Sequence, residues 1–177
     1  NNYKMSITKR RLEKEIGNLK SEKENPFETY ICKKNPRYLI MKLKGTKDTL
    51  YENGFFYIEF FIPDSYPLQP PPVRFMTRIF HPNIDKIGRI CIDILKDLWS
   101  PAMQIKTIGL SILLLLNNPN LKDPLDQQIA SIFRSKTEDA HKFAKEWTKQ
   151  YAIEKQDLGI DIENDFMNIN DLDEISL

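Results

Sequence analysis

The sequence predicts an α+β domain, in which strands and helices occupy separate parts of the chain. Three observations support this prediction. An amphipathic helical pattern comes first at residues 6–23, strand-like runs follow up to residue 76, and apolar helical segments fill the chain after residue 104. The length of 177 residues suits one domain that buries its core without disulfide bonds.

The first helix is expected at residues 6–23. Leu12, Ile16 and Leu19 recur at helical spacing, and Ser6 can cap the N-terminus. The opposite face carries four basic side chains: Lys9, Arg10, Arg11 and Lys14. This face is either a solvated surface or a surface that binds a partner.

Four strand-like runs predict an antiparallel meander. The runs at about 28–33, 38–44 and 54–62 are rich in β-branched and aromatic residues, and a shorter run lies at 73–76. Residues 77–103 then lack helical periodicity and predict a long ordered loop, a feature that usually carries function in compact domains. Helices follow this loop.

Charge divides the chain at residue 156. All 26 Lys and Arg residues and 18 of the 25 acids lie in residues 1–156, which therefore carry a formal charge of +8. We predict a core at residues 6–156 and an acidic, flexible tail at residues 157–177, which either solubilises the protein or binds the basic core or a partner. The basic core suits an acidic partner surface, and no nucleic-acid-binding motif accompanies it.

The sequence argues against a membrane, secreted or metal-binding protein. Its longest apolar run, residues 108–116, is far shorter than the roughly 20 residues that span a bilayer, and no secretory signal is visible. Cys32 and Cys91 lack metal-ligand spacing, which predicts free thiols in a reducing compartment and no metal site.

The stretch HPNIDKIGRIC at residues 81–91 contains His, Asn and Cys, three residue types that thiol enzymes use. Cys91 follows an irregular segment, and nearby Lys86 and Arg89 would favour a thiolate. Cys32 fits a buried strand position better.

A thiol hydrolase would need His81 or His141 as a base in contact with the cysteine. His81 precedes Pro82, and a histidine in such a turn more often bonds to the main chain. Taken alone, these residues suggest thiol chemistry near Asn83 and leave a hydrolase and a packed loop open.

Three stretches closely resemble the core of ubiquitin-conjugating enzymes: YPLQPPPVRF at 66–75, HPNIDKIGRICIDIL at 81–95 and WSPAMQI at 99–105. The similarity covers roughly residues 7–153. It includes His-Pro-Asn, seven further residues and then Cys, with a Trp eight residues after that Cys. The order of helix, four-stranded meander, long active-site loop and helices also resembles that family's fold.

The resemblance implies that Cys91 accepts ubiquitin as a thioester from an activating enzyme and passes it to a lysine. ATP is used by that separate enzyme, so no bound cofactor is expected. Asn83 would donate to the oxyanion, typically worth roughly 2.7–4 kcal/mol, or brace the loop. Asp123 would orient the lysine, or cap a helix before Pro124. The remaining groove residues would be His81, Leu125 and Gln127.

The resemblance also implies two protein-binding surfaces. One would bind the activating enzyme and a RING or U-box ligase through Arg11, Lys14, Leu68, Ser100, Pro101 and Ala102. The other surface is found in a subfamily that pairs with a catalytically inactive conjugating-enzyme variant. That subfamily builds non-proteolytic ubiquitin chains used in DNA repair and signalling, and this implies a cytoplasmic and nuclear location. This second surface would bind the variant through Glu59, Phe61, Arg74 and Arg89. Phe61 is either an aromatic anchor or a core residue.

The groove departs from that subfamily at two places. Leu121 and Lys122 stand where Pro-Asp is usual, and Gln127 and Gln128 replace an Asn-Asp pair. These changes alter the charge near the groove and bear on lysine selection. Two alternatives belong to the same family. Conjugation of another ubiquitin-like modifier is not excluded by the sequence, whereas a non-catalytic variant-type binding module would lack the acceptor thiol, which this chain has at Cys91.

Overall fold

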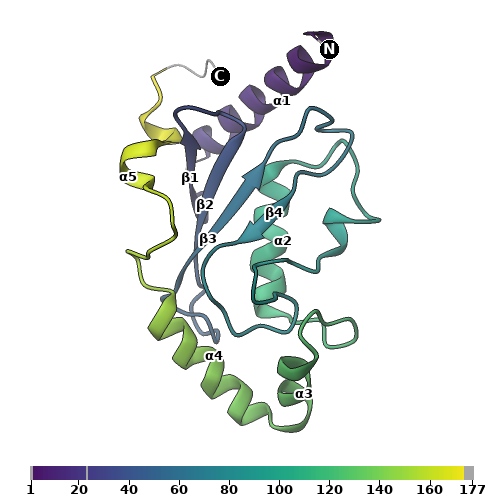
Figure 1. The fold of residues 1–177 in the computed structure, drawn as a ribbon, viewed down its shortest axis with the longest axis vertical. Helices are drawn as coiled ribbons and strands as arrows, with labels where there is room; N and C mark the ends of the chain where they lie inside the picture. The colour runs from purple at the N-terminus through teal and green to yellow at the C-terminus, as the bar shows by residue number, and fades with distance from the viewer. Residues whose placement is uncertain (1, 23, 174–177) are drawn as a thin grey trace.

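The computed structural model describes residues 2–22 and 24–173, and shows an α+β fold built around one sheet (Figure 1). The elements in chain order are α1 (Asn2–Ser21), β1 (Phe27–Cys32), β2 (Tyr38–Lys44), β3 (Phe55–Phe61), β4 (Val73–Phe75), η1 (Asp93–Leu95), α2 (Ile105–Asn117), α3 (Gln127–Ser135), α4 (Thr137–Tyr151), α5 (Ile162–Asp165), β5 (Phe166–Asn168) and η2 (Ile169–Asp171).

The predicted four-stranded antiparallel meander is confirmed, with strand order β4-β3-β2-β1. Its central pair, β2 and β3, is aligned from Tyr38 opposite Phe61 to Lys44 opposite Phe55. Because side chains alternate between the two faces of a strand, this register gives the sheet an inner and an outer face.

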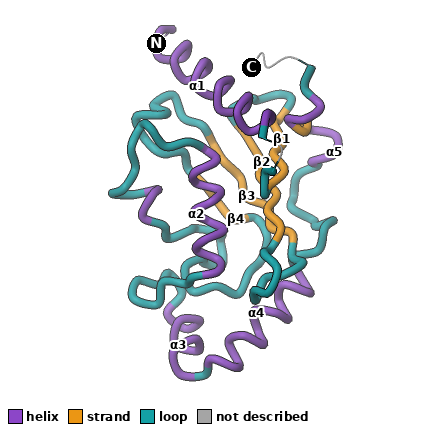
Figure 2. Tube along the Cα trace, turned by 180° about the vertical axis from the view of Figure 1, so that it is seen from behind, coloured by secondary structure: helices purple, strands orange, loops and turns teal. Residues whose placement is uncertain are grey.

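The inner face forms the main core against α1 and α2 (Figure 2). Leu39 and Phe56 from the strands pack with Ile16 from α1 and Ile108 from α2, and all four are fully buried. A Cβ at Gly109 would lie 2.6 Å from the sulfur of Met41. The missing side chain of Gly109 thus leaves room for the Met41 side chain where α2 approaches β2.

The first helix starts earlier than predicted. It begins at Asn2, so Ser6 lies inside the helix and is not its N-cap. No helix-breaking residue stands between these two positions, and the helix continues through them.

The acidic tail forms secondary structure, and the prediction of a flexible tail is wrong over residues 157–173. Its strand β5 pairs with the free edge of β1, with Phe166 opposite Cys32, and makes a fifth strand. Ile169, only 1% exposed, reaches the main core. The prediction failed because it rested on charge, whereas the tail's spaced apolar side chains meet an apolar outer face of the sheet.

That outer face is a second, smaller apolar layer. Ile40 and Tyr57 from the sheet are buried there together with Phe166, and tail residues Leu158 and Ile160 pack against them. The tail thus shields one face of the sheet as α1 and α2 shield the other. Among the described residues, no helix is long and apolar enough to span a membrane.

Candidate active site

Cys91 lies at the end of a tight loop that begins at Asn83. Asp85 holds this loop, because its Oδ1 accepts hydrogen bonds from the backbone N–H groups of Ile87 (3.1 Å) and Arg89 (2.9 Å). Gly88 adopts a φ of 84°, and a Cβ there would lie 1.9 Å from a backbone oxygen of β4. The chain then returns so that the Cys91 N–H donates to the Asn83 carbonyl at 2.9 Å.

His81 lies beneath this loop and does not line an open groove, contrary to the prediction. It is fully buried, its Nε2 donates to the Leu115 carbonyl at 3.0 Å, and its Nδ1 accepts from the Asn83 N–H at 3.0 Å. Burial lowers the pKa of His81 to about 4. With both ring nitrogens bonded within the fold, His81 is a loop-shaping residue and not the base of a thiol hydrolase.

Asn83 is also fully buried, and its side-chain amide joins two loops. Its Nδ2 donates to the carbonyls of Asn120 (2.8 Å) and Asp123 (3.3 Å), and its Oδ1 accepts from the Asn120 N–H (2.8 Å). The loop-bracing role is therefore present in the structure. Donation to an oxyanion stays a prediction, and it would require one of the two Nδ2 bonds to yield.

The thiol of Cys91 lies between the carboxylate of Asp123 and the amino group of Lys96. Its Sγ donates to Oδ2 of Asp123 at 3.6 Å, and Lys96 Nζ donates to the sulfur at 3.1 Å. The sulfur raises the pKa of Lys96, chiefly through this hydrogen bond. The sequence prediction named Arg89 as a nearby cation, but Arg89 bonds to Asp85 instead.

Lys96 was missed because it lies five residues after the cysteine, beyond the motif. The short helix η1 folds the chain back and returns Lys96 to the thiol. A cation five residues after a candidate nucleophile was the signal available in the sequence.

Asp123 is free to face the thiol because another residue caps the following helix. The side chain of Asp126 accepts from the Ile129 N–H at 2.9 Å, so the N-cap of α3 is Asp126 and the alternative role for Asp123 is wrong. The exposed side chains of Leu125 and Gln127 follow Asp123 on this surface. Thus the structure brings Cys91, Asp123 and the unpredicted Lys96 together. Within the described residues, no cluster of three or more His, Cys, Asp or Glu residues could hold a metal ion.

The family model for "Ubiquitin-conjugating enzyme" matches residues 11–150. The chain belongs to the ubiquitin-conjugating enzyme family. It is 45% identical over 150 residues to "Ubiquitin-conjugating enzyme E2 N" of Drosophila melanogaster, covering 85% of this chain and 99% of that enzyme. It is 44% identical over 144 residues to "Ubiquitin-conjugating enzyme E2 13" of Schizosaccharomyces pombe, covering 81% and 97%. Like its relatives, it is a thioester-forming transferase that works with ubiquitin and an activating enzyme.

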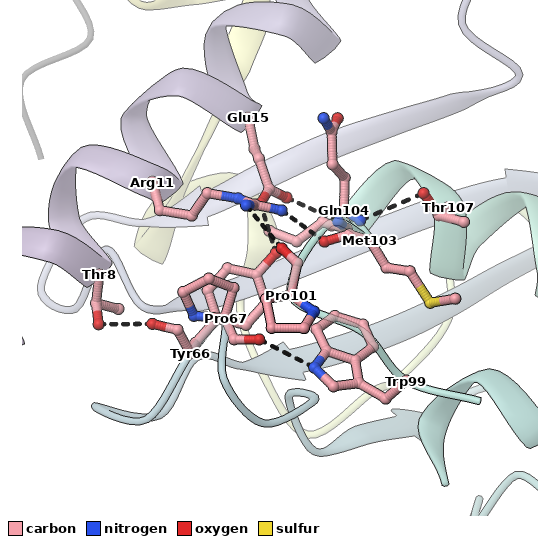
Figure 3. Close-up of polar contacts among 11 residues, drawn as sticks. Thr8, Arg11, Glu15, Tyr66, Pro67, Trp99, Pro101, Met103, Gln104 and Thr107 are labelled. Atoms are coloured by element: carbon pink, nitrogen blue, oxygen red, sulfur yellow. Dashed lines mark hydrogen bonds and ion pairs between the residues drawn. The ribbon is translucent and has the colours of Figure 1, made fainter. Parts of the chain in front are cut away.

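In this ubiquitin-conjugating enzyme, the three segments of the predicted ligase surface are joined by one polar network (Figure 3). Arg11 donates to the carbonyls of Pro101 (2.8 Å) and Met103 (2.6 Å) and pairs with Glu15. Buried Glu15 also accepts from the Tyr66 hydroxyl (2.6 Å), next to the loop that carries Leu68.

These contacts change the role expected of Arg11. Its guanidinium is used within the fold, where it holds α1 against residues 99–103, so its predicted role of direct partner contact is replaced by one of positioning. Leu68 is 71% exposed, and Lys14, Pro101 and Ala102 are also exposed, whereas Ser100 is half-buried. The exposed residues of the predicted ligase surface therefore surround the polar network of Arg11 and buried Glu15.

The predicted variant-partner residues differ in accessibility. Phe61 is 43% exposed on the outer face and stacks on Tyr38 at 4.7 Å, so the core alternative for Phe61 is wrong. The side chains of Arg74 and Arg89 are also exposed. Glu59 is only 2% exposed, since it pairs with Arg74 and accepts from the Tyr38 hydroxyl at 2.8 Å. Its predicted role as a contact residue is wrong, because these bonds use its carboxylate beneath the surface.

The buried, neutral His81 predicts a loss of stability in acid. The pKa of His81 is about 4 in the fold against about 6.5 in the unfolded chain, so the unfolded state takes up a proton first as pH falls. The contribution of neutral His81 to the free energy of unfolding is complete above pH 6.5 and falls by about 2 kcal/mol by pH 5. Urea unfolding at pH 7 and pH 5 should show a smaller loss for His81→Gln than for wild type.

His141→Gln is the matched control for this measurement, because that variant removes the chain's other histidine. Between pH 7 and pH 5, His141→Gln should lose as much stability as the wild type. An equal loss of stability in wild type and His81→Gln would contradict the assignment.

Proposed function

We propose that Cys91 accepts the C-terminus of ubiquitin as a thioester from the activating enzyme and transfers it to a lysine amine. One observation carries this proposal: the Cys91 sulfur lies within 3.6 Å of Asp123 Oδ2 and within 3.1 Å of Lys96 Nζ. An acceptor thiol needs to be a thiolate to attack, and a neighbouring cation favours that form.

The charging step exchanges one thioester for another. The Cys91 thiolate attacks the carbonyl carbon of the thioester on the activating enzyme, a new carbon–sulfur bond forms, and the activating enzyme's thiolate leaves. ATP is consumed by the activating enzyme before this step. Lys96 supports the attack by stabilising negative charge on the sulfur before it reacts.

The transfer step needs a neutral lysine, whose free pKa is about 10.4. Its amine attacks the thioester carbonyl, the amide bond forms and the Cys91 thiolate leaves, while the nitrogen gives up one proton, which Asp123 can accept and pass to solvent. Asp123 can accept a hydrogen bond from the attacking nitrogen and orient it, because its carboxylate already faces the sulfur. Asn83 would support the step by holding the Asp123 loop and by donating to the oxyanion when one of its bonds yields.

We further propose that this enzyme pairs with a catalytically inactive conjugating-enzyme variant and builds non-proteolytic chains in DNA repair and signalling, in the cytoplasm and nucleus. Its relatives carry the names E2 N and E2 13. Exposed Phe61 would be the aromatic anchor of this interface, and the exposed side chains of Arg74 and Arg89 would be further contact residues.

A RING or U-box ligase would bind the exposed residues around the Arg11 network. The network supports this proposal because it joins α1, the loop of Leu68 and the loop of Pro101 into one surface. Lys14 and Ala102 would lie at the edges of that surface.

A charging assay tests the acceptor thiol. With activating enzyme, ATP and ubiquitin, wild type should form an adduct that reductant removes, and Cys91→Ala should form none. Cys32→Ala is the matched control, because it removes the only other cysteine and should charge normally. An adduct on Cys91→Ala, or no adduct with folded wild type, would contradict the proposal; charging with another ubiquitin-like protein would redirect it to that modifier.

Arg11→Ala tests the ligase surface. It should lower ligase-stimulated discharge of ubiquitin by about threefold to tenfold, since lost charge-assisted hydrogen bonds of this kind are worth about 1.5–3 kcal/mol when fully formed and less at a partly exposed site. Discharge without ligase should change little. Arg10→Ala removes the same charge from an exposed neighbour and should have a weaker effect. Equal effects of the two substitutions would mean that charge alone, and not loop positioning, matters.

A further inference from the structure

The structured part of the tail is an addition to the family core. The family match ends at residue 150, and the 150-residue alignment with the Drosophila enzyme covers 99% of that enzyme but only 85% of this chain. Residues 157–173 nevertheless pack on the outer face of the sheet, where the predicted partner anchor Phe61 also lies.

A continuous aromatic contact links the tail to that anchor. The ring of Phe166 meets Tyr38 edge-on at 5.3 Å and 69°, and Tyr38 in turn stacks on Phe61 at 4.7 Å and 5°. The Tyr38 hydroxyl donates to Glu59, which pairs with Arg74. We define the aromatic patch as Tyr38, Phe61 and Arg74. Within this patch Tyr38 contacts Phe61 directly and Arg74 through Glu59, so Phe166 packs against the central residue of the patch.

The tail lies behind the aromatic patch and does not cover it. Phe166 is 5% exposed, whereas Phe61 is 43% exposed and the Arg74 side chain is 57% exposed. A partner protein can therefore reach the patch while the tail stays in place. The tail therefore supports the aromatic patch from behind and does not compete with a partner protein for it.

Two anchors, one on each side of Phe166, hold it in position. Before it, the Lys33 N–H donates to the Asp165 carbonyl at 2.9 Å, and Lys33 Nζ donates to the Asn164 carbonyl at 2.8 Å. After it, the β1–β5 pairing continues and Ile169 is buried in the main core. Phe166 is thus a fixed support for Tyr38.

We propose that the tail, through Phe166, preorganises the aromatic patch for binding the catalytically inactive conjugating-enzyme variant. This inference rests on the variant partner of the proposed function. Binding then avoids the entropy cost of ordering Tyr38 and Phe61, because the rings are already held in one arrangement in the free enzyme. The partner chemistry that fits is an apolar pocket for the Phe61 ring with polar groups near Arg74.

The test measures affinity for a recombinant variant subunit from the source organism by calorimetry. Phe166→Leu keeps an apolar side chain in the buried site but removes the ring edge, so the protein should remain folded. Phe166→Ala removes the support altogether. We expect binding to weaken slightly with Phe166→Leu and by roughly threefold to tenfold with Phe166→Ala.

Met167→Ala is the matched control, because Met167 is the next residue of the same strand and is exposed. It should leave affinity unchanged. Urea unfolding of all three variants identifies any that lose the fold, and ubiquitin charging should be equal to wild type in each folded variant, since Phe166 touches no residue of the thiol site.

The outcomes separate this inference from the proposed function. If wild type binds the variant subunit and both Phe166 variants bind it equally well or more tightly, the tail is not a support and this inference alone is overturned. If folded wild type does not bind the variant subunit, the proposed partner is wrong and the inference falls with it, while the charging result still stands.

Discussion

The side-chain amide of Asn83 is the interaction on which the geometry of the active site depends. It binds both polar groups of the Asn120 backbone, and the carbonyl of neighbouring Pro82 accepts the N–H groups of Leu125 and Asp126. Two loops far apart in the chain are thereby held together. Because one of them carries Cys91 and the other Asp123, the separation of thiol and carboxylate follows from these bonds.

Two further sets of contacts support that arrangement. Buried His81 fixes the loop from below through Leu115 of α2. The Arg11 and Glu15 network joins the first helix to the segment after the thiol loop. On the opposite face of the sheet, the tail completes a second apolar layer around Ile40 and supports Tyr38. Regular elements thus provide a rigid base, and the chemistry lies on the loops.

The sequence predicted the parts whose signal is local. The meander could be predicted because aromatic and β-branched residues are concentrated in each strand-like run, and the thiol loop because His-Pro-Asn and Cys91 stand at a specific spacing. The tail could not, because β5 is only three residues long and its acidic neighbours indicate disorder. Its position depends on the apolar outer face around Ile40, which no reading of the tail alone reveals.

Individual site residues were mispredicted for a related reason. The family resemblance assigned Arg11 and Glu59 to partner contact by their positions in the sequence. Each is instead paired inside the fold with a residue distant in sequence, Arg11 with the Pro101 carbonyl and Glu59 with Arg74. Lys96 was overlooked because only the turn of η1 brings it to the sulfur. The pairings of Arg11 and Glu59 arise from tertiary structure, and neither spacing nor composition encodes them, whereas the spacing of Lys96 from Cys91 was a signal in the sequence.

The most direct test of the central claim is amide hydrogen exchange in Asn83→Ala. The Asn120 N–H donates to Asn83 Oδ1 in the native enzyme, and removing that acceptor breaks a part-buried hydrogen bond worth about 1 kcal/mol. We predict faster exchange at Asn120 and through residues 120–126, with the strands of the sheet unchanged. Unchanged exchange at Asn120 would contradict the claim that Asn83 holds the two halves of the active site together.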